Sequence, residues 1–455
     1  MIDFSKFTKY SKPGPRYTSY PTAPEFHTEF TEKDLIEKFK NQSDDRPLSL
    51  YIHVPFCRSA CYFCGCNVIF TSKEDKKVKY IEYLKKELAI LKQHLNTNRT
   101  VTQMHFGGGT PTFLSPEQMA EVIASIKETF PNFAKDAEVS CEVDPRFFSQ
   151  GHMDALKTAG INRLSFGVQD LDEKVQETIH RIQPFETTRK VMDIARDAGI
   201  TSVNIDLIYG LPYQTKESFR QTIEQIIKLN PDRLAVFNYA HVPWMMKTQR
   251  KFDETTFAPP STKLEILKDT IAFFTGHGYK MVGMDHFAKP TDELFQAIEK
   301  GELHRNFQGY TTKGGADLIG IGVTSIGDGV DYYVQNFKTL KEYEAAIDSG
   351  HLPVFKGYSL NDDDILRQYV IMELMSNFSL DIKRTEEKFN INFKEYFKDA
   401  LEALKEFEEA ELLTITDKKI EANETGAMLI RNISMPFDAY LNNIPEDKRR
   451  FSKTI

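Results

Sequence analysis

Short apolar segments alternate with longer amphipathic segments through the middle of the chain. In the longer segments, apolar residues recur at the spacing of one helix face, as in residues 76–95, 116–130 and 216–229. The short segments have the composition of buried strands, and they span residues 48–54, 103–106, 137–143, 163–168, 202–208 and 233–239. This alternation predicts an α/β fold of six β-α units, with a parallel sheet and helices on its outside.

The order of the units also predicts where a functional site lies. Crossovers between parallel strands are right-handed, and ligands bind at the carboxyl ends of the strands in such folds. The residues that directly follow each expected strand are therefore the first candidates for chemistry.

A different pattern begins near residue 355. Helices are expected over residues 362–375 and 393–407, then a hairpin over residues 412–415 and 420–422, then a helix from Thr425. Helices followed by a small hairpin are typical of a winged-helix module. We predict three parts, namely an N-terminal arm (1–45), a barrel with an extension (46–354) and a mainly helical, winged-helix-like C-terminal domain (355–455).

Four of the five cysteines lie within one ten-residue segment, 57–66, shortly after the first expected strand. Cys57, Cys61 and Cys64 have the spacing C-x3-C-x2-C, and Cys66 comes two positions later. One short loop can hold three thiolates around a compact metal cluster. Because a 4Fe–4S cluster usually takes four thiolates, one for each iron, a loop with three ligands leaves one iron open to a substrate or cofactor.

Two other interpretations of the cysteines are less favoured. A disulfide framework is unusual in a chain of 455 residues with five cysteines and no secretory signal. A structural zinc site usually has a second ligand pair about 12–20 residues after the first, and no such pair follows here. Cys141 stands alone in an apolar run, and we expect it to be a core thiol.

Residues 107–112, Gly-Gly-Gly-Thr-Pro-Thr, follow the second expected strand. Consecutive glycines allow close backbone approach and expose N–H and C=O groups to a ligand. A phosphate loop would need a lysine and a different glycine spacing. A ligand-binding loop and a plain tight turn both remain open for this segment.

Acidic and amide residues lie in or just after the next three strands, at Glu142, Asp144, Gln169, Asp170 and Asp206. A single such residue is usually a helix cap or a solvated group. Several that converge on one rim could bind ribose hydroxyls and an ammonium group through charge-assisted hydrogen bonds.

The charge balance narrows the range of partners. The chain has 58 Lys and Arg against 66 Asp and Glu, a net charge of −8, which disfavours non-specific binding to nucleic acid or anionic membranes. No apolar run approaches the ~18 residues of a spanning helix, and the first residues form no apolar leader. We expect a cytoplasmic protein that binds no nucleic acid and does not insert into membranes.

Together these motifs resemble the oxygen-independent coproporphyrinogen III oxidases, a family of radical S-adenosylmethionine (SAM) enzymes of anaerobic haem synthesis. The resemblance covers nearly the whole chain and implies a partial (β/α)6 radical SAM barrel. The cysteine loop marks only the superfamily, whereas Cys66 and the runs 15–22 and 304–312 mark this family. Further matching runs are 51–66, 107–112, 142–145, 166–170, 204–212, 283–288 and 430–433.

The resemblance also implies the cofactors and their residues. Cys57, Cys61 and Cys64 would bind one 4Fe–4S cluster, and each chain would bind two SAM molecules. Cys66 would not be a ligand but would serve the chemistry. The residues expected around the cluster-bound SAM are Tyr51, Phe63, Gly108, Glu142 and Ile326, and those around the second SAM are Gly109, Thr110, Gln169, Arg181, Asp206 and Ala240.

The implied reaction converts two propionates of coproporphyrinogen III to vinyl groups and gives protoporphyrinogen IX. A 5′-deoxyadenosyl radical from SAM would remove hydrogen from each propionate, and an electron donor of flavodoxin or ferredoxin type would reduce the cluster. The enzyme is expected to be a monomer. By residue type, Arg16 and Arg305 are candidates for binding the substrate carboxylates.

Two alternatives remain open. The first is a related radical SAM protein that handles haem, either a haem chaperone or a haem-cleaving methyltransferase, although a chaperone should lack Cys66 and the run 15–22. The second is an electron-transfer protein without catalysis, which would need neither an open iron nor a large barrel. Cleavage of SAM by the reduced protein would separate these classes.

Overall fold

The computed structural model describes residues 2–445 and 451–452. The chain forms two compact units, each assembled from separate stretches of sequence. The barrel unit contains Phe26–Thr270 and Gly315–Ser359, and the terminal unit contains Met1–Glu25, Ile271–Gly314 and Leu360–Ile455. The contiguous domain ranges 1–45, 46–354 and 355–455 stay a prediction.

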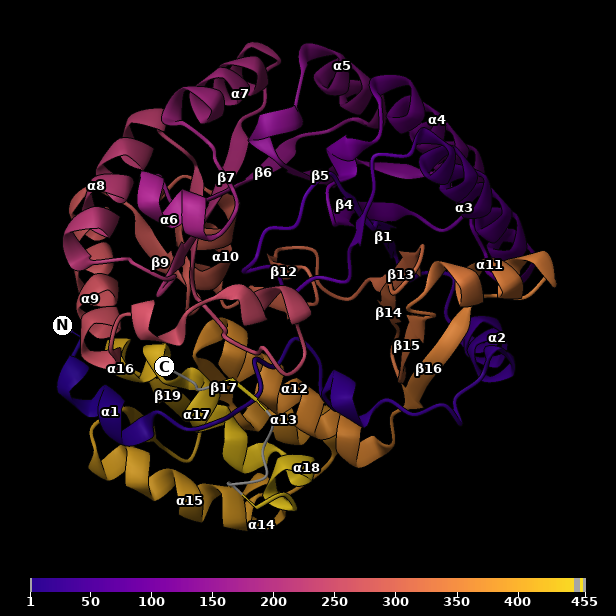
Figure 1. The fold of residues 1–455 in the computed structure, drawn as a ribbon. Coiled ribbons are helices and arrows are strands. Elements are labelled where there is room, and N and C mark those ends of the chain that lie inside the picture. Colours follow the sequence, from indigo (N-terminus) through magenta and orange to yellow (C-terminus); the bar gives the residue numbers. More distant parts are fainter. Residues whose placement is uncertain (1, 446–450, 453–455) are drawn as a thin grey trace. The chain divides into compact units, whose positions relative to one another are not determined.

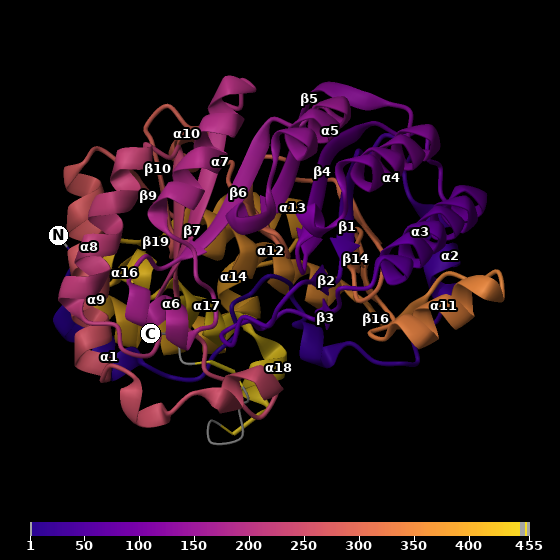
Figure 2. The same cartoon turned by 45° about the horizontal axis from the view of Figure 1, so that its top comes forward.

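The barrel unit is built on a run of parallel strands with helices outside them (Figures 1 and 2). The paired strands, in spatial order, are β1 (Leu48–Val54), β4 (Val101–Gly108), β5 (Phe133–Val143), β6 (Arg163–Gln169), β7 (Ser202–Tyr209) and β8 (Arg233–Asn238). The helices between them are α3 (Glu74–His94), α4 (Pro116–Thr129), α5 (Gln150–Ala159), α6 (Glu173–Thr178), α7 (Phe185–Asp197) and α8 (Lys216–Ile226). This arrangement confirms the predicted partial (β/α)6 fold.

The strands alternate in a way that places polar groups on one face. In β6, Leu164, Phe166 and Val168 are buried, whereas the residues between them are half-buried. β7 has the same alternation. Because successive side chains of a strand point to opposite faces, the apolar set packs on one side and the polar set, which includes Asp206, lines the other.

An antiparallel extension continues the sheet beyond β1. Strand β13 (Asp317–Ile321) pairs in parallel with β1, and β14 (Ile326–Asp328), β15 (Tyr332–Asn336) and β16 (Val354–Ser359) follow as antiparallel neighbours. Helices α2 (Glu32–Asn41) and α11 (Leu340–Asp348) belong to the same unit. Helix α2 begins with a capping box, in which the side chains of Thr31 and Asp34 bond to each other's backbone N–H groups.

The terminal unit is mainly helical and contains small antiparallel sheets. Its hairpins are β9 (Lys280–Val282) with β10 (His286–Ala288), and β11 (His304–Asn306) with β12 (Gly309–Thr311). A small sheet pairs β17 (Ser379–Asp381), β19 (Lys419–Ala422) and β18 (Leu413–Ile415) and includes the predicted hairpin. Its helices include α1 (Phe7–Tyr10), α10 (Glu293–Lys300), α12 (Asp362–Asn377), α13 (Ile382–Phe389), α16 (Glu424–Met428), α17 (Ile430–Ser434) and α18 (Ala439–Asn442).

One expected helix is divided in the structure. The pattern over residues 393–407 predicts a single helix, but the chain forms α14 (Phe393–Tyr396) and α15 (Lys398–Glu409) with Phe397 between them. Phe397 leaves helical geometry at φ −104°, ψ 28°, and its ring packs edge-on against Phe437 at 5.3 Å. The apolar spacing survives the break because both helices bury the same face. Among the described residues, no helix is long and apolar enough to span a membrane.

Candidate active site

The cysteine loop is fixed by contacts on both sides. It begins in β2 (Phe56–Cys57) and ends at β3 (Ile69–Phe70), which pair with each other. Tyr62 N donates to the carbonyl of Ile179 at 2.9 Å, and Gln249 Nε2 donates to the carbonyl of Phe63 at 2.9 Å. These partners come from two different β-α units, so the barrel itself sets the shape of the loop.

Cys57, Cys61 and Cys64 line one cavity of about 230 Å³, together with residues at the carboxyl ends of β4 to β7. Most of the predicted site residues line the same cavity, namely Phe63, Cys66, Gly108, Gly109, Thr110, Glu142, Gln169, Arg181 and Asp206. Tyr51, Ala240 and Ile326 do not belong to this lining. Ala240 follows β8, and Ile326 begins β14. Cys141 is fully buried, as predicted for a core thiol.

Tyr51 lies behind Glu142, with His105 between them. Tyr51 and His105 are paired in register on β1 and β4, and their rings stack at 5.9 Å between centroids. His105 Nε2 lies 3.4 Å from Glu142 Oε1, and the other carboxylate oxygen accepts from Gly108 N at 3.2 Å. The Glu142 carboxylate is therefore held by His105 on the neighbouring strand and by Gly108 in the glycine loop, residues 107–112.

The glycine loop needs small residues at two positions. Gly108 has φ +115°, and a Cβ there would meet the His53 ring at 2.7 Å. A Cβ on Gly109 would meet the Pro55 backbone at 2.8 Å. Side chains at these positions would push the loop away from the end of β1, so both glycines are needed for this close approach.

Asp206 is oriented by neighbours on the polar face of the sheet. Its Oδ2 accepts from Ser165 Oγ at 3.0 Å, and its Oδ1 accepts from Asn204 Nδ2 at 2.7 Å. Strand register places Ser165 beside Asn204 and Gly167 beside Asp206. The carboxylate thus reaches the cavity from a strand rather than from a mobile loop.

An Arg–Asp–Arg group lies beside Cys61. Asp144 binds Arg146 through both carboxylate oxygens, at 3.0 Å to Nε and 2.7 Å to Nη2, and it also accepts from Arg181 Nη1 at 3.1 Å. Although burial opposes ionisation, Arg181 and Arg146 lower the pKa of Asp144. The sequence pattern places Asp144 at a strand end and in a run that matches the family, but it gives no signal for Arg146.

The cysteines have different surroundings. Burial raises the pKa of Cys57 to about 12, and its Sγ lies 3.4 Å from Thr110 Oγ1. A hydrogen bond with Cys66 lowers the pKa of Cys64 and raises that of Cys66, and Cys66 N lies 3.4 Å from Cys64 Sγ. The Cys64 sulfur is thus faced by the backbone N–H of Cys66, whereas the Cys57 sulfur is faced by a hydroxyl.

The cavity suits a cluster held by three thiolates. Soft thiol ligands from one loop surround it, and the buried Nε of Arg181 has no hydrogen-bond partner among the described residues. No three His, Cys, Asp or Glu side chains in the described part of the chain converge on one ion. The thiols that line the cavity come from one loop, and they are the residue type that binds a 4Fe–4S cluster.

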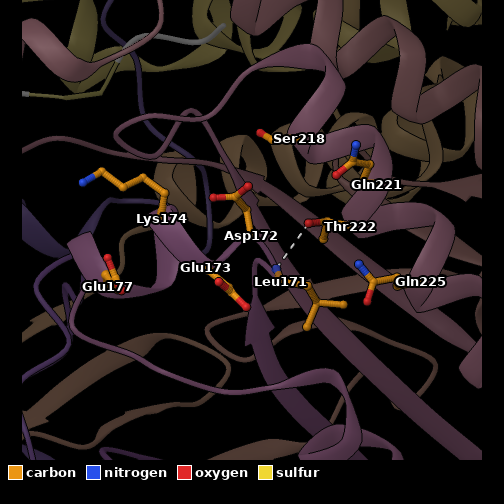
Figure 3. Close-up of a pocket in the computed structure, with 9 residues that line it drawn as sticks. All are labelled: Leu171, Asp172, Glu173, Lys174, Glu177, Ser218, Gln221, Thr222 and Gln225. Carbon is orange, nitrogen blue, oxygen red and sulfur yellow. Dashed lines mark hydrogen bonds between the residues drawn. The ribbon is translucent and has the colours of Figure 1, made fainter.

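A larger cavity of about 500 Å³ lies between α6 and α8 (Figure 3). Its polar side chains serve the local fold, since Asp172 caps α6 by accepting from Val175 N at 3.0 Å. Leu171 N donates to Thr222 Oγ1 at 3.2 Å, the bond drawn in Figure 3. None of the predicted site residues lines it, so we place the site at the cysteine loop.

The two arginine candidates for carboxylate binding lie in the terminal unit, near the same buried aspartate. Arg16 Nη1 is 3.8 Å from Asp285 Oδ2, and Asp285 Oδ1 lies 2.7 Å from His286 Nδ1. The Arg305 guanidinium stacks 4.6 Å from the centre of the Tyr310 ring. Despite burial, His286, Arg305 and Arg16 hold the pKa of Asp285 well below its usual range.

Arg305 has N–H groups that remain available to hydrogen-bond a ligand. Its buried Nε and Nη1 have no hydrogen-bond partner among the described residues. Burial, together with the charges of Arg16 and Arg305, lowers the pKa of Arg431 to about 9. Arg16 and Arg305 therefore lie close enough to Arg431 to affect its charge, and Asp285 is a nearby carboxylate that opposes this effect.

Comparison with known proteins agrees with this geometry. Residues 51–226 match the model of the radical SAM superfamily, and residues 360–429 match the model of the HemN C-terminal domain. A (β/α)6 barrel with a three-cysteine loop at the carboxyl ends of its strands defines a radical SAM enzyme.

Full-length relatives narrow the class. A protein of Helicobacter pylori (strain J99) named oxygen-independent coproporphyrinogen III oxidase is 59% identical over 100% of this chain and 99% of its own length. The protein of that name from Escherichia coli (strain K12) is 45% identical over 100% of this chain and 98% of its own. The chain belongs to the family of oxygen-independent coproporphyrinogen III oxidases.

A solved structure shares the fold as well. The coproporphyrinogen III oxidase HemN from Escherichia coli, described as a radical SAM enzyme, superposes with a TM-score of 0.92 at 44% identity. The match covers 97% of this chain and 99% of the other. This agreement extends the confirmed fold to the mainly helical C-terminal part within the matched 97% of the chain.

Proposed function

We propose that this protein oxidises coproporphyrinogen III without oxygen, converting two propionates to vinyl groups and giving protoporphyrinogen IX. The observation that carries the proposal is the three-thiol cavity at the strand ends, in a chain that matches oxidases of this name from end to end. The alternatives, a haem chaperone or haem-cleaving methyltransferase and a plain electron carrier, have no comparable support.

Each group of site residues has a proposed task. Cys57, Cys61 and Cys64 hold the 4Fe–4S cluster, which when bound supplies the electron for reductive cleavage of SAM. Glu142, held by His105 and Gly108 N, would line the site of the cluster-bound SAM and would accept charge-assisted hydrogen bonds from it. Tyr51 supports Glu142 through His105, and Phe63 and Ile326 contribute apolar surface.

A second SAM is proposed next to the first. Asp206 and Gln169 offer acceptors and donors for ribose and amino acid groups, and Arg181 offers the N–H that has no hydrogen-bond partner among the described residues. Gly109, Thr110 and Ala240 complete this site. Cys66 is proposed to serve the chemistry without binding iron, because it lines the cavity while its backbone N–H faces the sulfur of the ligand Cys64.

The partners follow from the same proposal. The electron comes from a donor of flavodoxin or ferredoxin type, and the enzyme works in the cytoplasm as a monomer. We propose no nucleic acid partner and no membrane insertion, in line with the net charge of −8.

The cysteines provide the decisive test. Replacing Cys57, Cys61 or Cys64 by Ser should abolish the Fe–S absorbance, SAM cleavage and vinyl formation in an anaerobic assay with coproporphyrinogen III, SAM and a reductant. Cys66→Ser should keep its iron but lose most turnover, and Cys141→Ala, outside the cavity, should keep both. A triple Ser variant that still takes up four irons would contradict the proposal. Equal losses of iron and turnover in Cys66→Ser would make Cys66 the fourth ligand.

Arg305 and Arg16 are proposed to bind a substrate carboxylate. A charge-assisted hydrogen bond contributes about 1.5–3 kcal/mol, so Arg305→Gln should weaken binding of fluorescent coproporphyrin III roughly 10- to 100-fold. Lys9→Gln removes a charge from the surface of the same unit, where Lys9 pairs with Glu406, and should leave binding unchanged. The tetramethyl ester of the porphyrin has no free carboxylates, so its affinity should be the same for the wild type and the variants. Unchanged affinity for the free acid in Arg305→Gln would exclude this role.

A further inference from the structure

Cys61 differs from the other two predicted ligands in the donors that face it. Arg146 Nη2 lies 3.8 Å and Arg181 Nη1 lies 3.7 Å from Cys61 Sγ. Cys57 instead contacts the hydroxyl of Thr110, and Cys64 contacts the backbone N–H of Cys66. Of the three sulfurs, Cys61 is thus the one approached by two guanidinium groups.

Both guanidinium groups are held in place before any cluster binds. The two-pronged contact with Asp144 fixes the plane of Arg146, and Arg146 also lies 5.2 Å from the centre of the Phe147 ring. Arg181 is anchored by Asp144 and by the carbonyl of Gly167, which accepts from its Nη2 at 2.6 Å. Neither arginine can turn away from Cys61 without breaking contacts that are shielded from solvent.

The charges of this group do not cancel. Two arginines share one aspartate, so a net positive charge remains beside the Cys61 sulfur. Hydrogen bonds to the sulfurs and nearby charge are main determinants of the reduction potential of an Fe–S cluster. A positive group that donates N–H to a thiolate stabilises the reduced cluster, which carries one more negative charge than the oxidised cluster.

We propose that Arg146 and Arg181, held by Asp144, form a cationic clamp on Cys61 that raises the reduction potential of the cluster. Arg146 is the new element, because Arg181 also belongs to the proposed second SAM site. The inference rests on the proposed function, since it needs the cluster on Cys57, Cys61 and Cys64. Arg146 acts through Cys61 and is therefore a positioning residue.

The test compares Arg146→Gln with a matched control. Arg58 belongs to the cysteine loop, is exposed and stacks 4.6 Å from the centre of the same Phe147 ring, so Arg58→Gln removes one charge from the same cavity lining. In the reconstituted enzyme without SAM, Arg146→Gln should keep its iron. At a fixed potential near the midpoint, its ratio of reduced to oxidised cluster should fall at least threefold. Arg58→Gln should change this ratio much less.

A second variant and a second readout keep the proposal testable. Arg146→Lys retains the charge but not the fork of N–H donors, so its ratio should lie between the wild-type value and that of Arg146→Gln. Loss of the N–H···S bond should also shift the Fe–S(Cys) resonance Raman bands to higher frequency. If Arg146→Gln cannot hold a cluster, Arg146→Lys decides the question.

Several outcomes would overturn the clamp. An unchanged reduction potential in both Arg146 variants would contradict the clamp. Equal shifts in Arg146→Gln and Arg58→Gln would also contradict it, because they would show an effect of any nearby charge rather than of a bond to Cys61. These results would leave the proposed function intact. A wild-type protein that takes up no four-iron cluster would instead contradict the proposed function itself.

Discussion

Two aspartates of the barrel unit each bind two arginines, but they lie at different ends of parallel strands. Asp144 directly follows the carboxyl end of β5, whereas Asp317 begins β13 and is paired in register with Leu48, the first residue of β1. Asp317 accepts from Arg46 Nε at 2.8 Å and also binds Arg99. The same combination of one aspartate and two arginines therefore occurs at a structural end and at a functional end of the strands.

The two groups differ in how completely they are satisfied. Arg99 donates through each of its nitrogens, with Nε to the carbonyl of Arg46 at 2.8 Å and Nη1 to Gln42 Oε1 at 3.0 Å. By contrast, the Nε of Arg181 has no hydrogen-bond partner within the described residues, and Nη groups of Arg181 and Arg146 point to Cys61. Arginines whose nitrogens all donate hydrogen bonds within the protein stabilise the fold. Arginines with an N–H group left over can donate to a ligand.

The largest expected effect is a loss of stability in Asp317→Asn, which would distinguish Asp317 from Asp144. Asp317 is fully buried, and removing one partner of a buried ion pair costs about 3–5 kcal/mol. Asp317→Asn should therefore lower the thermal unfolding midpoint of the anaerobic enzyme strongly and reduce the yield of folded protein. Circular dichroism would measure the midpoint, and a value within a degree or two of wild type would contradict the structural role.

Asp144→Asn should affect stability less and the cluster more. Its loss frees Arg146 and Arg181, whose side chains line the cavity, so we expect less than half of the Asp317→Asn change in unfolding free energy. The reduction potential of the cluster should shift, because the group loses its one negative charge and both guanidinium groups lose their anchor. A variant as unstable as Asp317→Asn with an unchanged potential would show that the two groups have the same role.

The smallest expected structural effect is at Asp206, which lies on the polar face near the Asp144 end. Asp206→Asn keeps the shape of the side chain but removes its charge, so unfolding should change little. Anaerobic equilibrium binding should show about one SAM per chain instead of two, with suppressed vinyl formation. Asp193→Asn, which changes an exposed carboxylate on α7, is the control. If Asp206→Asn still binds two SAM and turns over normally, Asp206 is structural.

Much of this protein was readable from local sequence. The expected strand 48–54 coincides with β1, and the spacing C-x3-C-x2-C marks a loop that can wrap a cluster with one iron open. Such features depend on periodicity and on short spacings within one segment, which fix local geometry. The parallel topology also singled out the acidic and amide residues at the strand ends, whereas the other expected site residues came from the resemblance to the family.

The tertiary structure decided which distant side chains meet. Arg146 and Arg181 reach Cys61 from positions 85 and 120 residues away along the chain, and Arg16 and Arg305 meet near Asp285 only in the folded terminal unit. The break at Phe397 likewise depends on its packing against Phe437. No local pattern encodes these contacts, because they depend on strand register, loop paths and core packing between segments far apart in sequence.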